Sequence, residues 1–182
     1  MTKRISSWIL YRWMGFRFES TIPLPSKYVI ALAPHTSNWD FLIGLLHSRA
    51  EGYKCQFMMK KFWFFWPLGY VMRALGGIPV ERSKKMSLTD QMAEQARKAD
   101  SFHLCITPEG TRKRVSDWKK GFYYIALKAE LPIMLYAVDY EKKLISCTKS
   151  ITPNGDIDTQ MKEIKEYFRN VKGKKPKLFT VD

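Results

Sequence analysis

The stretch that decides the fold is residues 28–40, Tyr28-Val-Ile-Ala-Leu-Ala-Pro-His-Thr-Ser-Asn-Trp-Asp40. Its first six residues are apolar and partly β-branched, which predicts a short buried strand. The apolar residues that follow Asp40 predict a helix over residues 39–50. We therefore expect His35 on the turn at the carboxyl end of a strand, where open α/β sheets place their ligand crevices.

His35 and Asp40 form a candidate acid–base pair. An imidazole can remove a proton from a substrate hydroxyl near neutral pH when a partner holds its other ring nitrogen. Five positions along a continuous helix correspond to about 140° of rotation, so the two side chains meet only if the chain turns between them. Ser37 supplies that break as the N-cap, with Asp40 in the first helical turn. Because Ser87 and Asp90 repeat this ordinary capping pattern, the spacing alone leaves both interpretations open.

Composition limits the class of protein. A chain of 182 residues is long enough for one domain with a proper core and too short for two ordinary ones, so we predict a single domain over 1–182. The formal net charge of +14 and the 14% of aromatic residues indicate a surface that attracts nucleic acid, phosphorylated metabolites or acidic lipid headgroups. The cysteines and histidines lack disulfide or metal-ligand spacing, so no metal is expected. With no membrane-spanning run and no secretory signal, we expect the cytoplasm, on or off a membrane surface.

Residues 1–20 are predicted to hold an amphipathic helix that lies on a membrane surface. Over residues 3–17 one helical face carries large apolar side chains and is surrounded by basic residues, as in interfacial helices. A terminal helix packed on its own domain is the alternative. The apolar face consists of Ile5, Trp8, Ile9, Trp13 and Phe16.

Two further segments favour contact with lipid. Residues 60–67, Lys-Lys-Phe-Trp-Phe-Phe-Trp-Pro, place five aromatic rings beside two lysines, and such rings prefer the headgroup level of a bilayer. A helix buried in the core would use the same residues. The basic tail at 171–182 is expected to be a solvated end that touches anionic lipid.

The rest of the pattern alternates strands and helices. This predicts a single α/β domain with a mixed, mostly parallel sheet flanked by helices. The expected helices are 87–99, 118–130 and 157–171, and the expected strands are 53–59, 76–82, 102–107, 132–139 and 143–150, the last at an edge.

Two strand ends carry candidate anion-binding residues. The turn after residues 102–107 contains a carboxylate, a glycine that permits unusual backbone angles and three cations, which suits an anion cradle. Its sequence is Pro108-Glu-Gly-Thr-Arg-Lys-Arg114. Arg82, at the end of another short strand, is able to hold a phosphate with two hydrogen bonds.

Four segments, in order, resemble the four blocks of the glycerolipid acyltransferase family, which includes 1-acylglycerol-3-phosphate acyltransferase. The segments are His35-Thr-Ser-Asn-Trp-Asp40, Gly77-Ile-Pro-Val-Glu-Arg82, Pro108-Glu-Gly-Thr-Arg112 and Leu131-Pro-Ile-Met, within residues 28–140. The resemblance implies a glycerol-3-phosphate acyltransferase-like fold. It also implies transfer of a fatty acyl group from coenzyme A or acyl carrier protein to the hydroxyl of a lysolipid, with 1-acyl-sn-glycerol-3-phosphate giving phosphatidic acid as the leading case.

The same resemblance assigns roles to residues. His35 would be the general base, and Asp40 would orient it and stabilise its charge. The acceptor's phosphate would be bound by Arg82, Glu109, Gly110, Thr111 and Arg112. The leucine-proline block would lie near the acyl pocket. No cofactor or metal is implied, because the thioester donor is already activated.

This chain departs from the family pattern in places. Glu81 stands where the family often has aspartate, and Leu135 stands where it often has a second proline, which leaves acyl-chain selection open. Only 34 residues precede His35, too few for a two-helix membrane motif, so we expect peripheral or monotopic contact with the cytoplasmic face of a membrane.

Other functions remain compatible with the sequence. The acceptor could be a different lysolipid, either a lysophospholipid or an acylated amino-acid lipid. Basic residues interleaved with aromatics also suit a nucleic-acid-binding domain, although that reading gives no reason for the pairing of His35 with Asp40.

Overall fold

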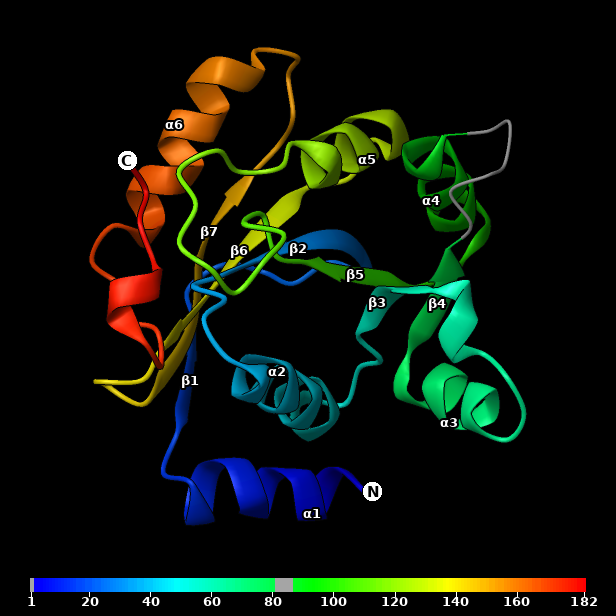
Figure 1. Cartoon of the computed structure of the whole chain (residues 1–182), viewed down its shortest axis with the longest axis vertical. Coiled ribbons are helices and arrows are strands. Elements are labelled where there is room, and N and C mark those ends of the chain that lie inside the picture. Colours follow the sequence, from blue (N-terminus) through cyan, green and yellow to red (C-terminus); the bar gives the residue numbers. More distant parts are fainter. Residues whose placement is uncertain (1, 81–86) are drawn as a thin grey trace.

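A single sheet forms the centre of the computed structural model, which describes residues 2–80 and 87–182 (Figure 1). Over those residues seven strands pair in the order β1-β7-β6-β2-β5-β3-β4, and only β6 and β7 are antiparallel neighbours. The strands are β1 (Arg17–Ser20), β2 (Lys27–Ala33), β3 (Gln56–Lys60), β4 (Gly77–Val80), β5 (Phe102–Ile106), β6 (Ile133–Asp139) and β7 (Leu144–Ile151). The predicted α/β class with a mixed, mostly parallel sheet is confirmed.

Helices cover both faces of this sheet. The helices α4, α5 and α6 pack on one face, α2 packs on the other, and α1 packs against α2 (Figure 1). The α-helices are α1 (Lys3–Ser7), α2 (Asn38–Glu51), α3 (Leu68–Leu75), α4 (Leu88–Lys98), α5 (Gly121–Ala129) and α6 (Ile157–Phe168). A π-helical stretch (Trp8–Trp13) continues α1, and short 3-10 helices span Lys61–Trp63 and Pro176–Leu178.

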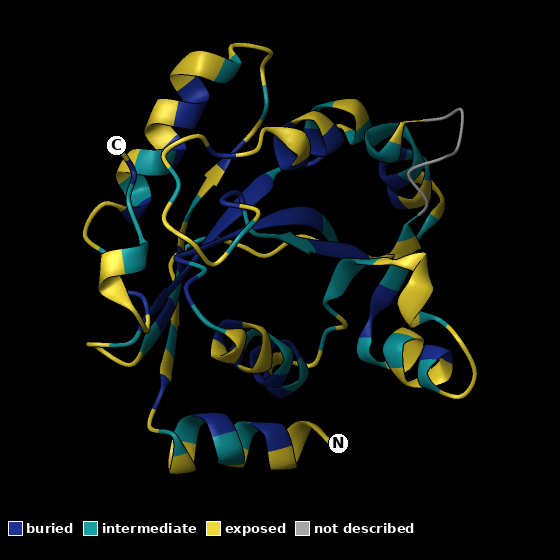
Figure 2. Cartoon of the chain, viewed as in Figure 1, coloured by how far each residue is buried: buried dark blue, intermediate teal, exposed yellow. Residues whose placement is uncertain are grey.

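Strand β2 lies in the middle of the sheet and is apolar for a physical reason. Val29 and Ala31 pack into the core cluster under α4, α5 and α6, whereas Ile30 and Leu32 pack into the cluster under α2 and the π-helical stretch. A parallel strand that is covered on both faces needs a continuous apolar run rather than an alternating one. Figure 2 shows this buried centre. Because β2 is parallel to both β5 and β6, the carboxyl ends of these strands meet at one edge.

The beginning of the chain differs from the prediction. The helix ends at Trp13 rather than at residue 17, and residues Arg17–Ser20 form β1, which pairs with β7. The expectation that residues 143–150 form an edge strand is therefore wrong, because β1 occupies that edge. Trp8 and Trp13 are exposed, but Phe16 is buried.

The aromatic stretch and the basic tail also have definite positions. Phe62, Trp63, Phe65 and Trp66 are exposed, which rules out the buried-helix alternative for residues 60–67. The lysines of the tail are exposed, as predicted for a solvated basic end, but the tail is held against the domain. Gly173 is buried against the turn that holds His35, and Val181 and Phe179 pack with the core under α6. Within the described residues, no helix has the length and apolar character needed to cross a membrane.

Candidate active site

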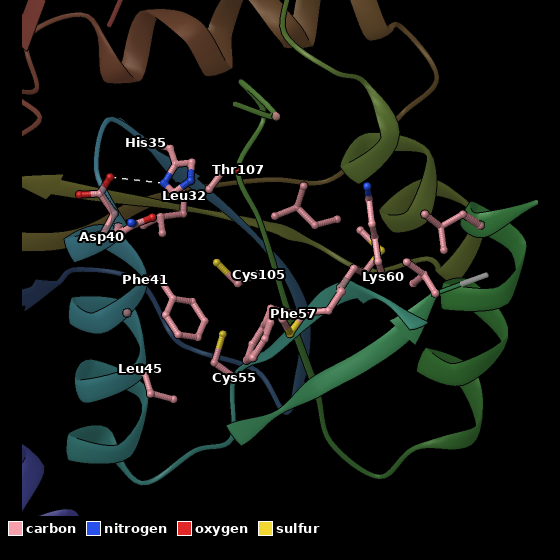
Figure 3. A pocket seen from close by; sticks show the side chains of 18 of the residues that line it. Leu32, His35, Asp40, Phe41, Leu45, Cys55, Phe57, Lys60, Cys105 and Thr107 are labelled. Carbon is pink, nitrogen blue, oxygen red and sulfur yellow. Dashed lines mark ion pairs between the residues drawn. The ribbon is translucent and has the colours of Figure 1, made fainter. Parts of the chain in front are cut away.

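The candidate site lies where the carboxyl ends of three neighbouring strands meet. His35 follows β2, Glu109 follows β5 and Tyr140 follows β6. A cavity of about 830 Å³ opens beside His35 and extends between α2 and strands β3 and β5 (Figure 3). Ligand sites of α/β sheets are expected at such an edge.

His35 and Asp40 are brought together by the local structure that the sequence predicted. Ser37 is the N-cap of α2, and its own N–H donates to Oδ2 of Asp40 at 2.8 Å in a capping box. The chain therefore turns between His35 and Asp40, and Nδ1 of His35 lies 3.3 Å from Oδ2 of Asp40 (Figure 3).

The Asp40 carboxylate is fully buried but well satisfied. Oδ2 also accepts the N–H of Thr36 at 2.8 Å, and Oδ1 accepts the hydroxyl of Tyr140 at 2.6 Å. Burial by itself would raise the pKa of Asp40. The interactions with His35, Tyr140, Ser37 and Thr36 outweigh it and hold the pKa below its usual value, so Asp40 is ionised at neutral pH.

His35 remains accessible from the cavity. About 20% of its side chain is exposed, and the residue lines the cavity wall beside Leu32 and Thr107. Because Asp40 lies beside Nδ1, the other ring nitrogen, Nε2, is the one positioned to meet a substrate. The imidazole is therefore neither sealed in the core nor turned away from its carboxylate.

Glu109 supports the histidine turn from behind. It is 4% exposed, and its Oε2 accepts the backbone N–H of His35 at 2.8 Å. Burial raises the pKa of Glu109 to about 8; the hydrogen bond from His35 opposes this shift, and the charge of Asp40 adds to it. A buried carboxyl group in this position is suited to fix the turn.

The other predicted phosphate ligands are placed differently from one another. Gly110 lines the cavity and has a φ of 67°, a left-handed conformation that favours glycine. Thr111 and Arg112 follow it but lie outside the cavity lining, and Arg112 is exposed. Arg82 falls outside the described residues.

The sequence interpretation missed three residues at this edge of the sheet. Lys60 ends β3 and lines the cavity, together with Lys61. The sequence interpretation had assigned both lysines to the membrane-facing aromatic stretch, although a basic residue at the end of a parallel strand is a signal for this edge of the sheet. Tyr140 was missed because nothing near it in the sequence marks its partner.

Apart from its polar rim, the cavity is lined by apolar side chains. They come from β2, α2, β3, β4, β5 and the start of α4, and they form a sleeve that leads away from His35. The side chains are Leu32, Phe41, Leu45, Phe57, Met58, Met59, Val80, Leu88 and Ile106. A long apolar ligand with one polar end fits such a lining.

Comparisons with known proteins agree with this geometry. A family model described as Acyltransferase matches residues 16–138. The chain is 25% identical over 158 residues to the Homo sapiens 1-acyl-sn-glycerol-3-phosphate acyltransferase beta, covering 82% of this chain and 56% of the relative. It is 29% identical over 132 residues to the 1-acyl-sn-glycerol-3-phosphate acyltransferase of Saccharomyces cerevisiae, covering 68% of this chain and 42% of the relative. The chain thus spans about half the length of the curated relatives it matches.

One solved structure shares the fold. It is the crystal structure of the 1-acyl-sn-glycerophosphate (LPA) acyltransferase, PlsC, from Thermotoga maritima. The match has a TM-score of 0.61 at 15% identity and covers 91% of this chain and 74% of the other. At this identity the match supports the arrangement of strands and helices.

Proposed function

The chain belongs to the acyltransferase family, and we propose that it transfers a fatty acyl group from a thioester to the free hydroxyl of a lysophospholipid. The acceptor we favour is 1-acyl-sn-glycerol-3-phosphate, which gives phosphatidic acid, and the donor is acyl-coenzyme A or acyl carrier protein. The observation that carries the proposal is His35 at the mouth of an apolar cavity with the Asp40 carboxylate beside its Nδ1.

The reaction needs one base and one charge partner. Nε2 of His35 accepts the proton of the acceptor hydroxyl as the oxygen attacks the thioester carbonyl carbon, and Asp40 stabilises the resulting imidazolium. The tetrahedral intermediate then expels the thiolate, and the imidazolium returns a proton to the sulfur. The products are the ester and the free thiol, so atoms and charge balance. A positioned base of this kind contributes roughly 10²–10⁴-fold in rate.

The apolar cavity is the proposed site for the acyl chain. A volume of about 830 Å³ lies within the range of small-molecule sites, about 300–1,000 Å³. Phe41 and Leu45 of α2 and Phe57 of β3 line it, and the rings of Phe41 and Phe57 pack edge to face with their centroids 4.9 Å apart. Methylene groups that enter this lining leave water, which favours a long chain over a short one.

The acceptor's phosphate is proposed to lie at the basic rim of the cavity. Lys60 and Lys61 line the cavity, and Arg112 with Gly110 and Thr111 follows the neighbouring strand β5. By the family resemblance Arg82 joins this set. Glu109 is not a good direct ligand for a phosphate, because its carboxyl group is buried and occupied by the N–H of His35. Its proposed role is to hold the turn.

We also propose that the protein works on the cytoplasmic face of a membrane. Trp8, Trp13, Phe62 and Trp66 are 60%, 71%, 77% and 80% exposed, and tryptophan and phenylalanine at a surface favour the bilayer interface. Lys3 of α1 and Leu75 of α3 line one depression, so these two helices approach each other there. The net charge of +14 favours anionic lipid.

The test is a product assay with a panel of substrates. Purified protein is mixed with vesicles that contain 1-acyl-sn-glycerol-3-phosphate and with an acyl thioester, and free thiol and product mass are measured. We expect thiol release and a phosphatidic acid mass that His35→Ala abolishes without lowering the melting temperature. Thiol release at the same rate in the variant would show that the proposal is wrong.

The same panel separates the alternatives. An acceptor without a phosphate should gain little from the basic rim, so Arg112→Ala should spare its turnover while slowing that of 1-acyl-sn-glycerol-3-phosphate. Turnover of another lysolipid alone would change the assigned acceptor. Salt-sensitive binding of oligonucleotides without affinity for anionic vesicles would favour a nucleic-acid-binding domain instead.

A further inference from the structure

Tyr140 touches the candidate catalytic pair from the side opposite the imidazole. It follows the last residue of β6, and its hydroxyl donates to Oδ1 of Asp40 at 2.6 Å. The other oxygen, Oδ2, accepts the N–H groups of Thr36 and Ser37 and faces His35. Both oxygens of the carboxylate are therefore held, each by different donors.

This arrangement fixes the plane of the carboxylate. The terminal torsion of an aspartate side chain has a broad energy minimum, so a carboxylate bound at one oxygen can swing about its Cβ–Cγ bond. The hydroxyl of Tyr140 at Oδ1 and two amides at Oδ2 remove that freedom. Oδ2 of Asp40 is then kept at 3.3 Å from Nδ1 of His35.

A short segment, residues 172–175, fixes Tyr140 in turn. The carbonyl oxygen of Lys172 accepts the N–H of Tyr140 at 2.9 Å, and the N–H of Lys175 donates to Oγ1 of Thr36 at 3.1 Å. The segment thus joins Tyr140 to the turn that carries His35, and both bonds to the segment use its main chain.

Gly173 allows this segment to approach the turn closely. A Cβ atom built at Gly173 would lie 2.9 Å from Cβ of Pro34 and 2.9 Å from Oγ1 of Thr36, which is too close for real side chains. Any residue other than glycine would push the segment away from the turn. Gly173 is itself buried although its neighbours in the segment are exposed.

The ring of Tyr140 is packed on two sides. Phe16 meets it edge-on at a centroid distance of 5.7 Å. The ammonium of Lys174 lies 4.2 Å from the ring centroid of Trp39 and 5.9 Å from that of Tyr140, within the range of cation–π attraction. The ring position is therefore set by packing, so the hydroxyl alone can be removed without loss of the contacts around it.

We propose that Tyr140 is a positioning residue for the acyl transfer, and that residues 172–175 fix the position of Tyr140 relative to the turn that carries His35. The inference rests on the proposed function, because it assigns Tyr140 a role through Asp40 and His35. Tyr140 does not contact the substrate. It keeps the carboxylate aligned so that charge on the imidazole is stabilised when the acceptor hydroxyl loses its proton.

The expected signature is a change in pH dependence. Three titratable groups lie around the His35–Asp40 pair: Tyr140 after β6, Glu109 after β5 and Lys174 in residues 172–175. Loss of the Tyr140 hydroxyl raises the pKa of Asp40, because the negative charge of the carboxylate loses one hydrogen bond. The protonated form of the His35–Asp40 pair is then favoured. The acidic limb of the pH–rate profile should move to higher pH.

The experiment compares Tyr140→Phe with the unaltered full chain on vesicles that contain 1-acyl-sn-glycerol-3-phosphate, from pH 5 to pH 9. We expect kcat to fall about tenfold or more, KM to stay within about twofold, and the acidic limb to move upward. Tyr167→Phe is the matched control, because the Tyr167 hydroxyl bonds Thr148 far from the site. It should leave the profile unchanged.

A second variant tests the segment. Gly173→Ala should displace residues 172–175 and lower kcat in the same way, whereas Gly121→Ala, where an added Cβ meets no atom within 4 Å, should have no effect. A Tyr140→Phe profile identical to that of Tyr167→Phe would overturn the inference, as would a lower kcat with an unmoved acidic limb, which indicates a merely structural role. If the unaltered protein forms no product at all, the proposed function fails instead.

Discussion

Oδ2 of Asp40 lies 3.3 Å from Nδ1 of His35, and the same oxygen accepts the N–H of Ser37 at the start of α2. One carboxylate therefore caps a helix and faces an imidazole. The sequence left these two interpretations as alternatives, and the geometry satisfies both at once. Asp90 has the equivalent place in α4 but is only half-buried and pairs with Lys128, so it shows what the capping pattern does without a histidine.

Asp40→Asn separates the charge of Asp40 from its capping role. The amide oxygen can still accept the N–H groups of Thr36 and Ser37, so the melting temperature should change little, but the negative charge beside the imidazole is lost. We expect kcat to fall about 10²-fold in the thiol-release assay. Asp40→Ala should lose the cap as well, at a cost to stability of about 1 kcal/mol or more.

Asp90→Ala is the control for that cap. It removes the equivalent residue of α4, and should lower stability without lowering kcat. If Asp40→Asn kept full activity, the carboxylate would be only a cap.

Glu109→Gln tests the buried carboxyl group behind His35. A carboxyl group whose pKa is raised on folding, here from 4.5 to about 8, adds stability that is fully present below pH 4.5 and is lost as the pH rises through 8. The unaltered protein should therefore lose stability between pH 5 and pH 8, by at most about 1.4 kcal/mol per pH unit from this group. In Glu109→Gln the stability should change less with pH between pH 5 and pH 8.

The measurement is the melting temperature at several pH values. Glutamine still accepts the N–H of His35, so activity at pH 7 should stay near that of the unaltered protein, whereas Glu109→Ala should lower it. Glu163→Gln, which removes an exposed carboxylate paired with Lys149, is the control and should leave the slope between pH 5 and pH 8 unchanged. Parallel curves for Glu109→Gln and the unaltered protein would contradict the raised pKa.

The centre of the sheet was predictable from the sequence because its strands are buried on both faces. Strands β2, β5 and β6 consist of apolar runs that end at polar turns, and these turns supply His35 and Glu109. Strand β1 was not predictable in the same way. Its four residues, Arg17–Ser20, are mostly exposed, and only pairing with β7 makes them a strand.

The residues that hold the His35–Asp40 pair in place could not be predicted from the sequence, because they are distant in the chain or act through their main chain. Tyr140 lies 100 positions from Asp40, and no local pattern links two residues so far apart. Residues 172–175 contain three lysines, which usually indicates a solvated surface. The contacts that hold this segment use the main chain of Lys172 and Lys175, and main-chain contacts leave no mark on residue type.

Trp13→Ser combined with Trp66→Ser tests the proposed membrane surface. Each ring is largely exposed, and burial of a tryptophan in the interface withdraws up to about 150–250 Å² from water. We expect the double variant to bind anionic vesicles about tenfold or more weakly in a sedimentation assay, with an unchanged melting temperature. Tyr124→Ser, an exposed aromatic on α5 across the sheet, should bind normally. Equal binding by all three proteins would exclude this surface.

Gly44→Leu tests whether the cavity holds the acyl chain. Gly44 lines the cavity on α2, between Phe41 and Leu45, and an added Cβ there meets no atom within 4 Å. A leucine side chain would fill the sleeve beyond His35 and exclude the far end of a long chain. Each excluded methylene costs about 0.8 kcal/mol, so loss of about four should lower kcat/KM for a palmitoyl donor about 10²-fold. An octanoyl donor, which ends before the obstruction, should be used nearly as well as before.

Stability separates this effect from damage to the fold. Replacing a glycine inside a helix by leucine favours the helix by roughly 0.8 kcal/mol, so Gly44→Leu should melt no lower than the unaltered protein. Gly121→Leu, which also enters open space but at the start of α5 and outside the cavity, should leave the chain-length preference unchanged. Equal losses for palmitoyl and octanoyl donors would mean that the acyl chain binds elsewhere, because a block within its path must discriminate by length.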